Sequence, residues 1–184
     1  MKWYLLFVAA FMPSMALASD GVWQVEGAES SIKFSVAIEG SLTEGEFPEF
    51  EAKILFDKEK LDQAKVEITI GLNYIEAIYG DVAANLKKKD WFDVARFPKA
   101  RFVSTAFKHL DGDNYQVTGS LRLRDVTRAE TLYFTLIRYD QKQAEIKGKM
   151  VINRLNYGVG QGAWRDLSSV AGQVFLNVVI KAAR

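Results

Sequence analysis

The sequence contains no cysteine and only one histidine, and both absences narrow the possible functions. A chain without cysteine forms no disulfide bond, so its folded state depends on its apolar core. One histidine without any thiol supplies too few ligands for a typical zinc site. That histidine, His109, stands beside an expected hairpin turn at 111–114, where it is poorly placed to be the oriented base of a Ser-His-Asp triad. We therefore expect no metal site, no cofactor and no enzyme of these kinds.

An excess of charge of either sign is also lacking. The 24 basic residues nearly balance the 23 acidic residues, which leaves a formal net charge of +1. Nucleic-acid-binding domains usually carry a strongly basic stripe or patch. We therefore expect no nucleic-acid partner.

The first 18 residues have the pattern of a secretory signal peptide. Lys2 precedes a mostly apolar run, and two alanines occupy the cleavage-determining positions at its end. The run is shorter than the roughly 20 residues that a membrane-spanning helix needs, and Pro13 interrupts it. We expect residues 1–18 to be removed and residues 19–184 to form one formally neutral domain without a transmembrane span. Because no cysteine is available for lipid attachment, the expected product is a soluble protein of a bacterial periplasm.

Apolar and polar residues alternate with a period of two along most of the mature chain. This period is typical of antiparallel strands with one buried face. About eight such strands follow one another, and closing them into an eight-stranded antiparallel barrel would leave no unpaired edge. A two-sheet sandwich is the alternative. The residues that we place on the inner face are Phe34, Val36, Ile38, Ile54, Phe56, Ile68, Ile70, Leu121 and Met150.

One stretch, near 74–94, departs from this pattern and predicts the single helical excursion of the domain. The apolar residues that recur there at helical intervals are Ile75, Ile78, Val82 and Leu86. Three lysines follow at 87–89, where they complement the negative end of a helix dipole or, alternatively, meet an anionic head group.

The segment 88–102 is crowded with aromatic residues, although Pro98 prevents a continuous helix or strand ladder there. Its rings either close one end of the barrel as part of the core or line the mouth of a cavity, and the two interpretations are compatible. A glycine-rich stretch at 158–162 lacks the strand-turn-helix context of a phosphate-binding loop, so we expect a flexible rim loop. The candidates near the mouth or the plug are Trp91, Phe92, Phe97 and Trp164.

Several polar residues allow two interpretations. Asp90 is expected to cap a helical turn with Asp93 near its positive end, and acid–base catalysis by the two carboxylates is the alternative. Arg122 and Arg124 share the polar face of a strand and are expected at the solvated outer surface, with an anion-binding patch as the alternative.

Two further expectations concern the strands. A turn is expected at 40–45, between two of the alternating segments. The strand at 130–139 is apolar on both faces, so a helix, a terminal segment or a second subunit is expected to cover one of them. The last of these options would make the protein a homodimer.

The alternating faces carry more large apolar side chains than the turns and the helix can cover. A tightly filled barrel would bury them against one another, whereas a wider barrel would hold a hydrophobic guest. Each methylene that such a guest buries contributes about 0.8 kcal/mol, so a long chain binds without specific polar contacts.

Motifs along the mature chain resemble those of the YceI-like family. The most recognisable is the run from Leu86 to Asp93, followed by Phe97-Pro98. One departure is Asp125, where members usually carry glycine before Val-Thr, and we expect the aspartate to adopt the left-handed backbone of that turn. The other matches are Trp23, Ser31-x-x-Phe34, Phe102-x-Ser104, Tyr115-x-Val117-x-Gly119-x-Leu121, Val126-Thr127, Asn153-Arg154, Tyr157-Gly158-Val159-Gly160 and Gly162-Ala163-Trp164.

This resemblance implies a secreted, lipocalin-like barrel that binds a polyisoprenoid, such as an isoprenoid quinone or a prenyl phosphate, and that is not an enzyme. It also implies a dimer for some members. Two other hypotheses stay open. The outer surface of a closed barrel would bind a protein such as a membrane redox enzyme, or the mouth would catalyse a reaction on a lipid through Asp90 or Asp93.

Overall fold

The computed structural model describes residues 22–184, and the expected signal peptide, residues 1–18, lies outside this range. The described chain contains one α-helix, α1, at Gly80–Leu86. Its short 3-10 helices span Gly27–Glu29, Leu72–Tyr74, Arg154–Tyr157 and Gly162–Arg165. The strands are β1 Val22–Val25, β2 Ser31–Ile38, β3 Ser41–Glu46, β4 Phe50–Leu55, β5 Lys65–Gly71, β6 Glu76–Ala77, β7 Lys99–His109, β8 Asn114–Leu123, β9 Val126–Tyr139, β10 Gln143–Asn153 and β11 Gln173–Ala183.

Eight of these strands form a closed ring. Their order is β1, β4, β5, β7, β8, β9, β10 and β11, and β1 closes the ring by pairing with β11. All neighbouring pairs are antiparallel. The predicted all-β fold, an eight-stranded antiparallel barrel with one helix, is therefore confirmed, and the two-sheet sandwich is excluded.

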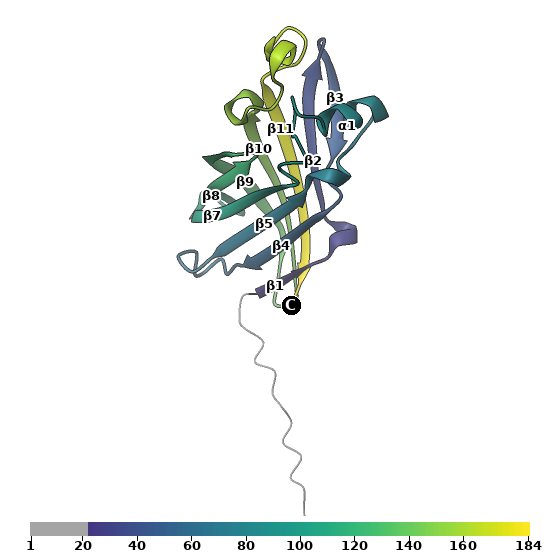
Figure 1. Cartoon of the computed structure of the whole chain (residues 1–184). Coiled ribbons are helices and arrows are strands. Elements are labelled where there is room, and N and C mark those ends of the chain that lie inside the picture. The colour runs from purple at the N-terminus through teal and green to yellow at the C-terminus, as the bar shows by residue number, and fades with distance from the viewer. Residues whose placement is uncertain (1–21) are drawn as a thin grey trace, which may run out of the picture.

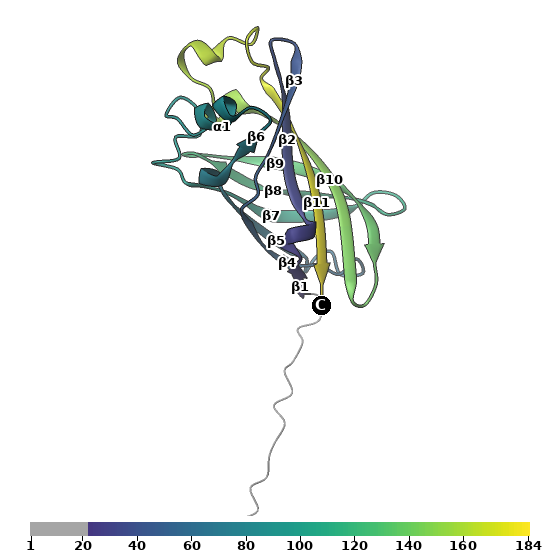
Figure 2. The ribbon, with the colours of Figure 1, turned by 90° about the vertical axis from the view of Figure 1, so that its right-hand side faces the viewer.

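The two ends of the barrel differ. β11 pairs with β1 through its last residues, Ala182 and Ala183, and with β2 through residues 175–179. From β2 the sheet continues beyond the ring into β3 and β6. We call the end that carries β1 and the C-terminus the closed end. The opposite end, which carries α1, the β2–β3 hairpin and the loop before β11, is the mouth end (Figure 1 and Figure 2).

The helix is shorter than the sequence period predicts. α1 covers only Gly80–Leu86, because Glu76–Ala77 pairs with β3 as a short strand. The edge of β3 offers free backbone groups to this segment, and the Ile78 N–H donates to the Glu44 carbonyl at 3.1 Å. Ile75 is buried whereas Ile78 is 63% exposed, so the two isoleucines do not share a helical face.

The turn expected at 40–45 is a strand instead. The β2–β3 hairpin turns at Glu39 and Gly40, which both have positive φ, and β3 begins at Ser41. Gly45 lies inside β3 because the Phe34 ring crosses it, and a Cβ atom built there would be 2.2 Å from that ring. This glycine therefore marks a close contact between side chain and backbone.

The strand that is apolar on both faces is β9. Its outer side chains Tyr133 and Ile137 are 55% and 50% exposed, so no element within residues 22–184 covers them. The helix, one expected cover, lies beside β6 at the mouth end instead.

Within residues 22–184, no helix is both long and apolar enough to cross a bilayer.

Candidate functional site

An apolar cavity of about 360 Å³, which we call the upper cavity, opens at the mouth end. Small-molecule sites typically have volumes of roughly 300–1,000 Å³, so this cavity is large enough for a ligand. Its walls come from the inner faces of β2, β8 and β11, from α1 and from the loop that follows β10. The polar or charged side chains in its lining are Glu39, Asp81, Asn85 and Arg154.

A second cavity of about 140 Å³, the lower cavity, lies deeper in the barrel toward the closed end. All of its lining residues are apolar. The two cavities adjoin along the barrel, because they share four wall residues, and we refer to them together as the channel. The shared residues are Ile32, Ile70, Leu121 and Leu176.

Nearly all the candidate ligand-binding residues line this channel. Phe34, Val36, Ile38, Trp91, Phe92 and Trp164 line the upper cavity. Ile54, Phe56, Ile68 and Met150 line the lower cavity, and Ile70 and Leu121 line both. Phe97 does not line either cavity and instead packs against Arg96 and Arg124, with guanidinium-to-ring distances of 5.0 and 5.6 Å. The role of these residues in holding a ligand remains a prediction.

An aromatic cluster forms the floor of the channel at the closed end. Phe56 is its centre, and its ring centroid lies 5.8–6.1 Å from four other rings. Trp23 fastens this residue by donating its indole N–H to the Phe56 carbonyl at 2.9 Å. The four rings around Phe56 belong to Phe107, Tyr115, Phe134 and Tyr139.

The aromatic segment 88–102 is both core and cavity wall. Trp91 and Phe92 are 7% and 8% exposed, and both line the upper cavity. The Trp91 ring packs on the Trp164 ring at 5.3 Å, and the Arg154 guanidinium lies 5.4 Å from it. Trp91 and Phe92 therefore belong to the core and to the wall of the cavity mouth at the same time.

Arg124 holds the backbone of this segment, and its expected place on the solvated outer surface is wrong. Its side chain is 8% exposed and donates through Nη1 to the carbonyls of Lys89 and Trp91. Arg124 also has a φ of +56°, so the left-handed residue of the β8–β9 turn is Arg124 rather than Asp125. A strained backbone of this kind persists where surrounding contacts impose it, and the two carbonyl contacts do so here.

Arg154 fastens the loop before β11. The side chain is 2% exposed, and all five of its N–H groups are engaged with backbone carbonyls at 2.7–3.4 Å. Gly160 has a φ of +81°, and a Cβ atom there would lie 2.0 Å from the Arg154 guanidinium. The rim loop thus lies at the mouth end as expected, with Trp164 packed down. The carbonyls that accept from Arg154 belong to Val159, Gly160, Trp164, Val170 and Ala171.

Burial changes the proton affinity of two groups near the mouth. It lowers the pKa of Arg154, whose partners are carbonyls rather than a carboxylate. It raises the pKa of Tyr157, and the hydrogen bond from its hydroxyl to Glu130 at 2.6 Å raises this pKa further. The Trp91 indole N–H has no hydrogen-bond partner among the described residues, so the upper cavity wall contains one buried donor without an acceptor.

The two carboxylates considered for catalysis do not line the channel. Asp93 is buried, 3.6 Å from Arg96 in an ion pair, and its carbonyl accepts from the N–H groups of Arg96 and Phe97. One turn begins at Lys88, whose carbonyl accepts from the N–H groups of Trp91 and Asp93, and the next begins at Asp93. The expectation that a helical turn begins at Asp90 is therefore wrong. Among residues 22–184, no three His, Asp or Glu side chains gather closely enough to hold a metal ion.

Sequence reasoning missed several of the wall residues that lie outside the strands. Phe47, Val159 and Val170 line the upper cavity, but they come from connections in which no periodicity marks an inner face. Ile32 and Leu176 carried the required signal, since they alternate in phase with Phe34 and with the other apolar residues of the last strand. The sequence does not predict the burial of Arg154, because a lone arginine after a strand is usually exposed to solvent.

The comparison with protein families decides the identity of this barrel. The model of the YceI-like domain matches residues 23–182, which is nearly the whole described chain. The chain belongs to the YceI-like family. The matched range contains the closed-end tryptophan, the aromatic segment and both arginine-held loops.

Known members and solved structures agree with this assignment. The UPF0312 protein of Shewanella denitrificans is 29% identical over 98% of this chain and 95% of its own length. The crystal structure of BcnA from Burkholderia cenocepacia has a TM-score of 0.82 at 30% identity, covering 86% of this chain and 99% of that one. A polyisoprenoid-binding domain from Saccharophagus degradans, implicated in plant cell wall breakdown, has a TM-score of 0.69 at 14% identity. That match covers 89% of this chain and 98% of the domain, and it shows a shared fold.

Proposed function

We propose that this protein binds a long-chain apolar lipid, a polyisoprenoid, in its channel and carries or sequesters it in the periplasm. The observation that carries the proposal is the channel itself, whose walls are mainly apolar, and which is closed by the Phe56 cluster and open at the mouth. The description of the Saccharophagus domain as polyisoprenoid-binding supports it, since that domain has the same fold. The signal-peptide pattern of residues 1–18 supports the location.

The orientation of the guest follows from the position of the polar wall groups. The lower cavity has only apolar walls, whereas the polar lining residues and the Trp91 N–H belong to the upper cavity. A chain therefore binds with its tail toward Phe56 and its head group toward the mouth, because a buried polar head group without partners would cost about 1–3 kcal/mol.

Mass spectrometry of the intact protein tests this function. The protein is isolated from the periplasm of its own organism, and bound lipid is identified after extraction. We expect a stoichiometric prenyl lipid. Isolation of ligand-free protein only, together with no uptake of prenyl lipids in vitro, would refute the carrier function.

A matched pair of variants separates the channel from the outer wall. Ile68→Arg places a charge in the lower cavity and is expected to abolish uptake, whereas Val151→Arg, at a position 48% exposed on the outer wall, is expected to leave it unchanged. Circular dichroism and urea unfolding show whether each variant is folded. Ile68→Phe, which fills space without adding charge, serves if Ile68→Arg does not fold.

A second candidate function uses the outer wall. Tyr133, Ile137, Val151 and Phe175 are exposed apolar side chains on β9, β10 and β11, and such a surface suits a protein partner or a second copy of the chain. For this function the matched pair should behave in the opposite way. Val151→Arg should lose binding of the partner, whereas Ile68→Arg should keep it. Analytical ultracentrifugation of the two variants shows in addition whether the wall joins two subunits.

Binding without catalysis is part of the proposal. The supporting observation is that Asp90 and Asp93 lie outside the channel wall. The test is incubation with a prenyl phosphate, for which we expect recovery of unchanged lipid. A product that disappears with Asp90→Asn or Asp93→Asn would show an enzyme instead.

A further inference from the structure

The mouth end carries a concentration of exposed apolar side chains. Residues 22–184 contain twelve large apolar side chains that are exposed, and half of them lie at this end. Each of the six is itself a wall residue of the upper cavity or lies within three residues of one along the chain. The six, with their exposed fractions, are Leu42 (64%), Tyr74 (61%), Ile78 (63%), Tyr79 (61%), Trp164 (37%) and Leu167 (56%).

These six residues come from three separate segments around the opening. Leu42 lies in the β2–β3 hairpin, the residues from Tyr74 to Tyr79 lead into α1, and Trp164 and Leu167 belong to the loop before β11. Figure 2 shows the three segments together at one end of the molecule, opposite β1 and the C-terminus. The closed end is poorer in such residues, with Leu110 exposed in its turns and Val22 exposed in β1. The exposed apolar residues therefore surround the entrance to the channel.

The chemistry of these side chains fits the boundary between water and lipid. Tyrosine and tryptophan have an apolar ring and a polar tip, and they are enriched at the head-group level of membranes. Leu42, Ile78 and Leu167 would add aliphatic groups that enter the acyl region. Protein interfaces, in contrast, usually bury such groups in one continuous patch rather than on separate loop tips.

We propose that the mouth end docks on the surface of a phospholipid bilayer and thereby exchanges the channel's guest directly with the membrane. The proposal rests on the lipid-binding function above. A prenyl chain that crosses water exposes each methylene at a cost of about 0.8 kcal/mol, whereas a mouth in contact with the bilayer removes most of this cost. Docking by the mouth also brings the head group of the guest level with the lipid head groups.

Charge is not the main source of this contact. The segments around the opening carry exposed groups of both signs, with the bases Lys88, Lys89 and Arg165 beside the acids Glu39, Asp81 and Asp166 in the charge balance, so neither sign dominates the mouth. Attraction to anionic lipid would require a cluster of basic residues, and here the two signs are mixed. We therefore expect docking on zwitterionic bilayers and only a weak dependence on salt.

Flotation with phosphatidylcholine vesicles tests the proposal on the full mature chain. The double variant Ile78→Asp/Leu167→Asp changes two mouth residues that do not line the channel. Its matched control, Ile137→Asp/Val151→Asp, changes two outer-wall residues that are 50% and 48% exposed. All four side chains are exposed, so the substitutions leave the core intact. We expect the mouth variant to lose vesicle binding by on the order of tenfold or more, and the control to bind like the wild type.

Two ways of supplying the lipid separate docking from lipid binding itself. A prenyl lipid is offered either in vesicles or from a small volume of ethanol. The mouth variant is expected to take up lipid from ethanol like the wild type but to take it up from vesicles at least about tenfold more slowly. Absence of uptake from either source would refute the lipid-binding function while the flotation result still decides docking.

Three results would overturn the docking proposal. The first is that the wild-type chain does not float with phosphatidylcholine vesicles. The second is that the mouth variant and the outer-wall control lose binding equally. The third is that flotation requires anionic lipid and disappears at high salt, which would assign the contact to the lysines instead.

Discussion

The closed end and the mouth end of this barrel are held together by different forces. At the closed end, the aromatic rings around Phe56 pack against one another, and hairpins join the strands. At the mouth end, two buried arginines, Arg124 and Arg154, hold irregular segments by their backbone carbonyls. Apolar side chains fill the space at the closed end, whereas the arginines hold the backbone around an open cavity. The same sequence thus builds a sealed floor and an open entrance.

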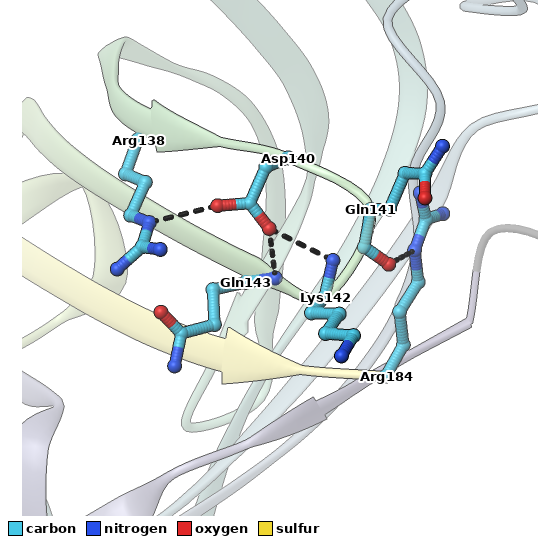
Figure 3. A network of polar contacts seen from close by, with 6 residues as sticks. All are labelled: Arg138, Asp140, Gln141, Lys142, Gln143 and Arg184. Carbon is cyan, nitrogen blue, oxygen red and sulfur yellow. Dashed lines mark hydrogen bonds and ion pairs between the residues drawn. The ribbon is translucent and has the colours of Figure 1, made fainter.

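The turns of the closed end are also tied by local polar contacts. Figure 3 shows the β9–β10 turn, in which the Asp140 carboxylate accepts from the backbone N–H groups of Lys142 and Gln143 and from Arg138. Arg184, the last residue, donates to the Gln141 carbonyl at 2.9 Å. These contacts fasten the C-terminal strand to a neighbouring hairpin. At the mouth end, Arg154 instead bonds to carbonyls that lie five to seventeen residues away along the chain.

Removal of the central ring tests the closed end and gives the largest effect that we expect. Phe56→Ala deletes a side chain that is 6% exposed and touches four other rings, and it should lower the free energy of unfolding by about 3–5 kcal/mol. Urea unfolding measures this change. Phe175→Ala, at an outer position 45% exposed, is the control and should cost far less. Equal losses in the two variants would contradict the role of Phe56 as the floor.

Replacement of Arg154 tests the mouth end, and its effect should be smaller and more local. Arg154→Met keeps much of the side-chain volume but removes five hydrogen bonds, and we expect a loss of about 2 kcal/mol. The cost stays limited because the loop opens and its carbonyls then bind water. Hydrogen exchange should therefore accelerate at 158–171 and remain unchanged in β7 and β8. Arg128→Met, at an exposed arginine with one bond to the Asn156 carbonyl, is the matched control.

The comparison of the two ends also explains what the sequence could predict. Alternation with a period of two identified the strands, the barrel and inner-face residues such as Phe34 and Ile68, because packing in regular strands depends on local pattern. The mouth end depends on contacts between distant segments. Arg124 bonds to residues about 33–35 positions away, and no local pattern signals such a bond. The helix was overestimated for the same reason, since the free edge of β3 lies far from Glu76 in the sequence.

A larger side chain in the lower cavity should place the floor of the channel nearer to the mouth. Met150→Trp adds volume to the wall of the lower cavity, so the tail of a long guest loses contact there. Exclusion of two methylenes costs about 1.6 kcal/mol, which corresponds to a more than tenfold weaker affinity for long prenyl chains. Chains short enough to stay in the upper cavity should bind as before. Equal weakening for short and long chains, measured by competition with a fluorescent lipid, would argue against a single channel.

The polar turn at the closed end gives the smallest effect and a defined dependence on pH. Its three hydrogen bonds lower the pKa of Asp140 in the folded protein to about 2, below the ordinary value for an aspartate. A depressed folded-state pKa means that the turn contributes stability above about pH 4 and loses it as the pH falls through about 2. Asp140→Asn should therefore lower the melting temperature slightly at pH 7, and the difference from the wild type should vanish near pH 2.

Because the carboxylate is exposed to solvent, the change at neutral pH should be smaller than for Phe56→Ala or Arg154→Met. Asp62→Asn, at an exposed aspartate in the β4–β5 connection, is the control substitution. A difference between Asp140→Asn and the wild type that persists at pH 2 would show that the turn acts through shape rather than through the charge of Asp140.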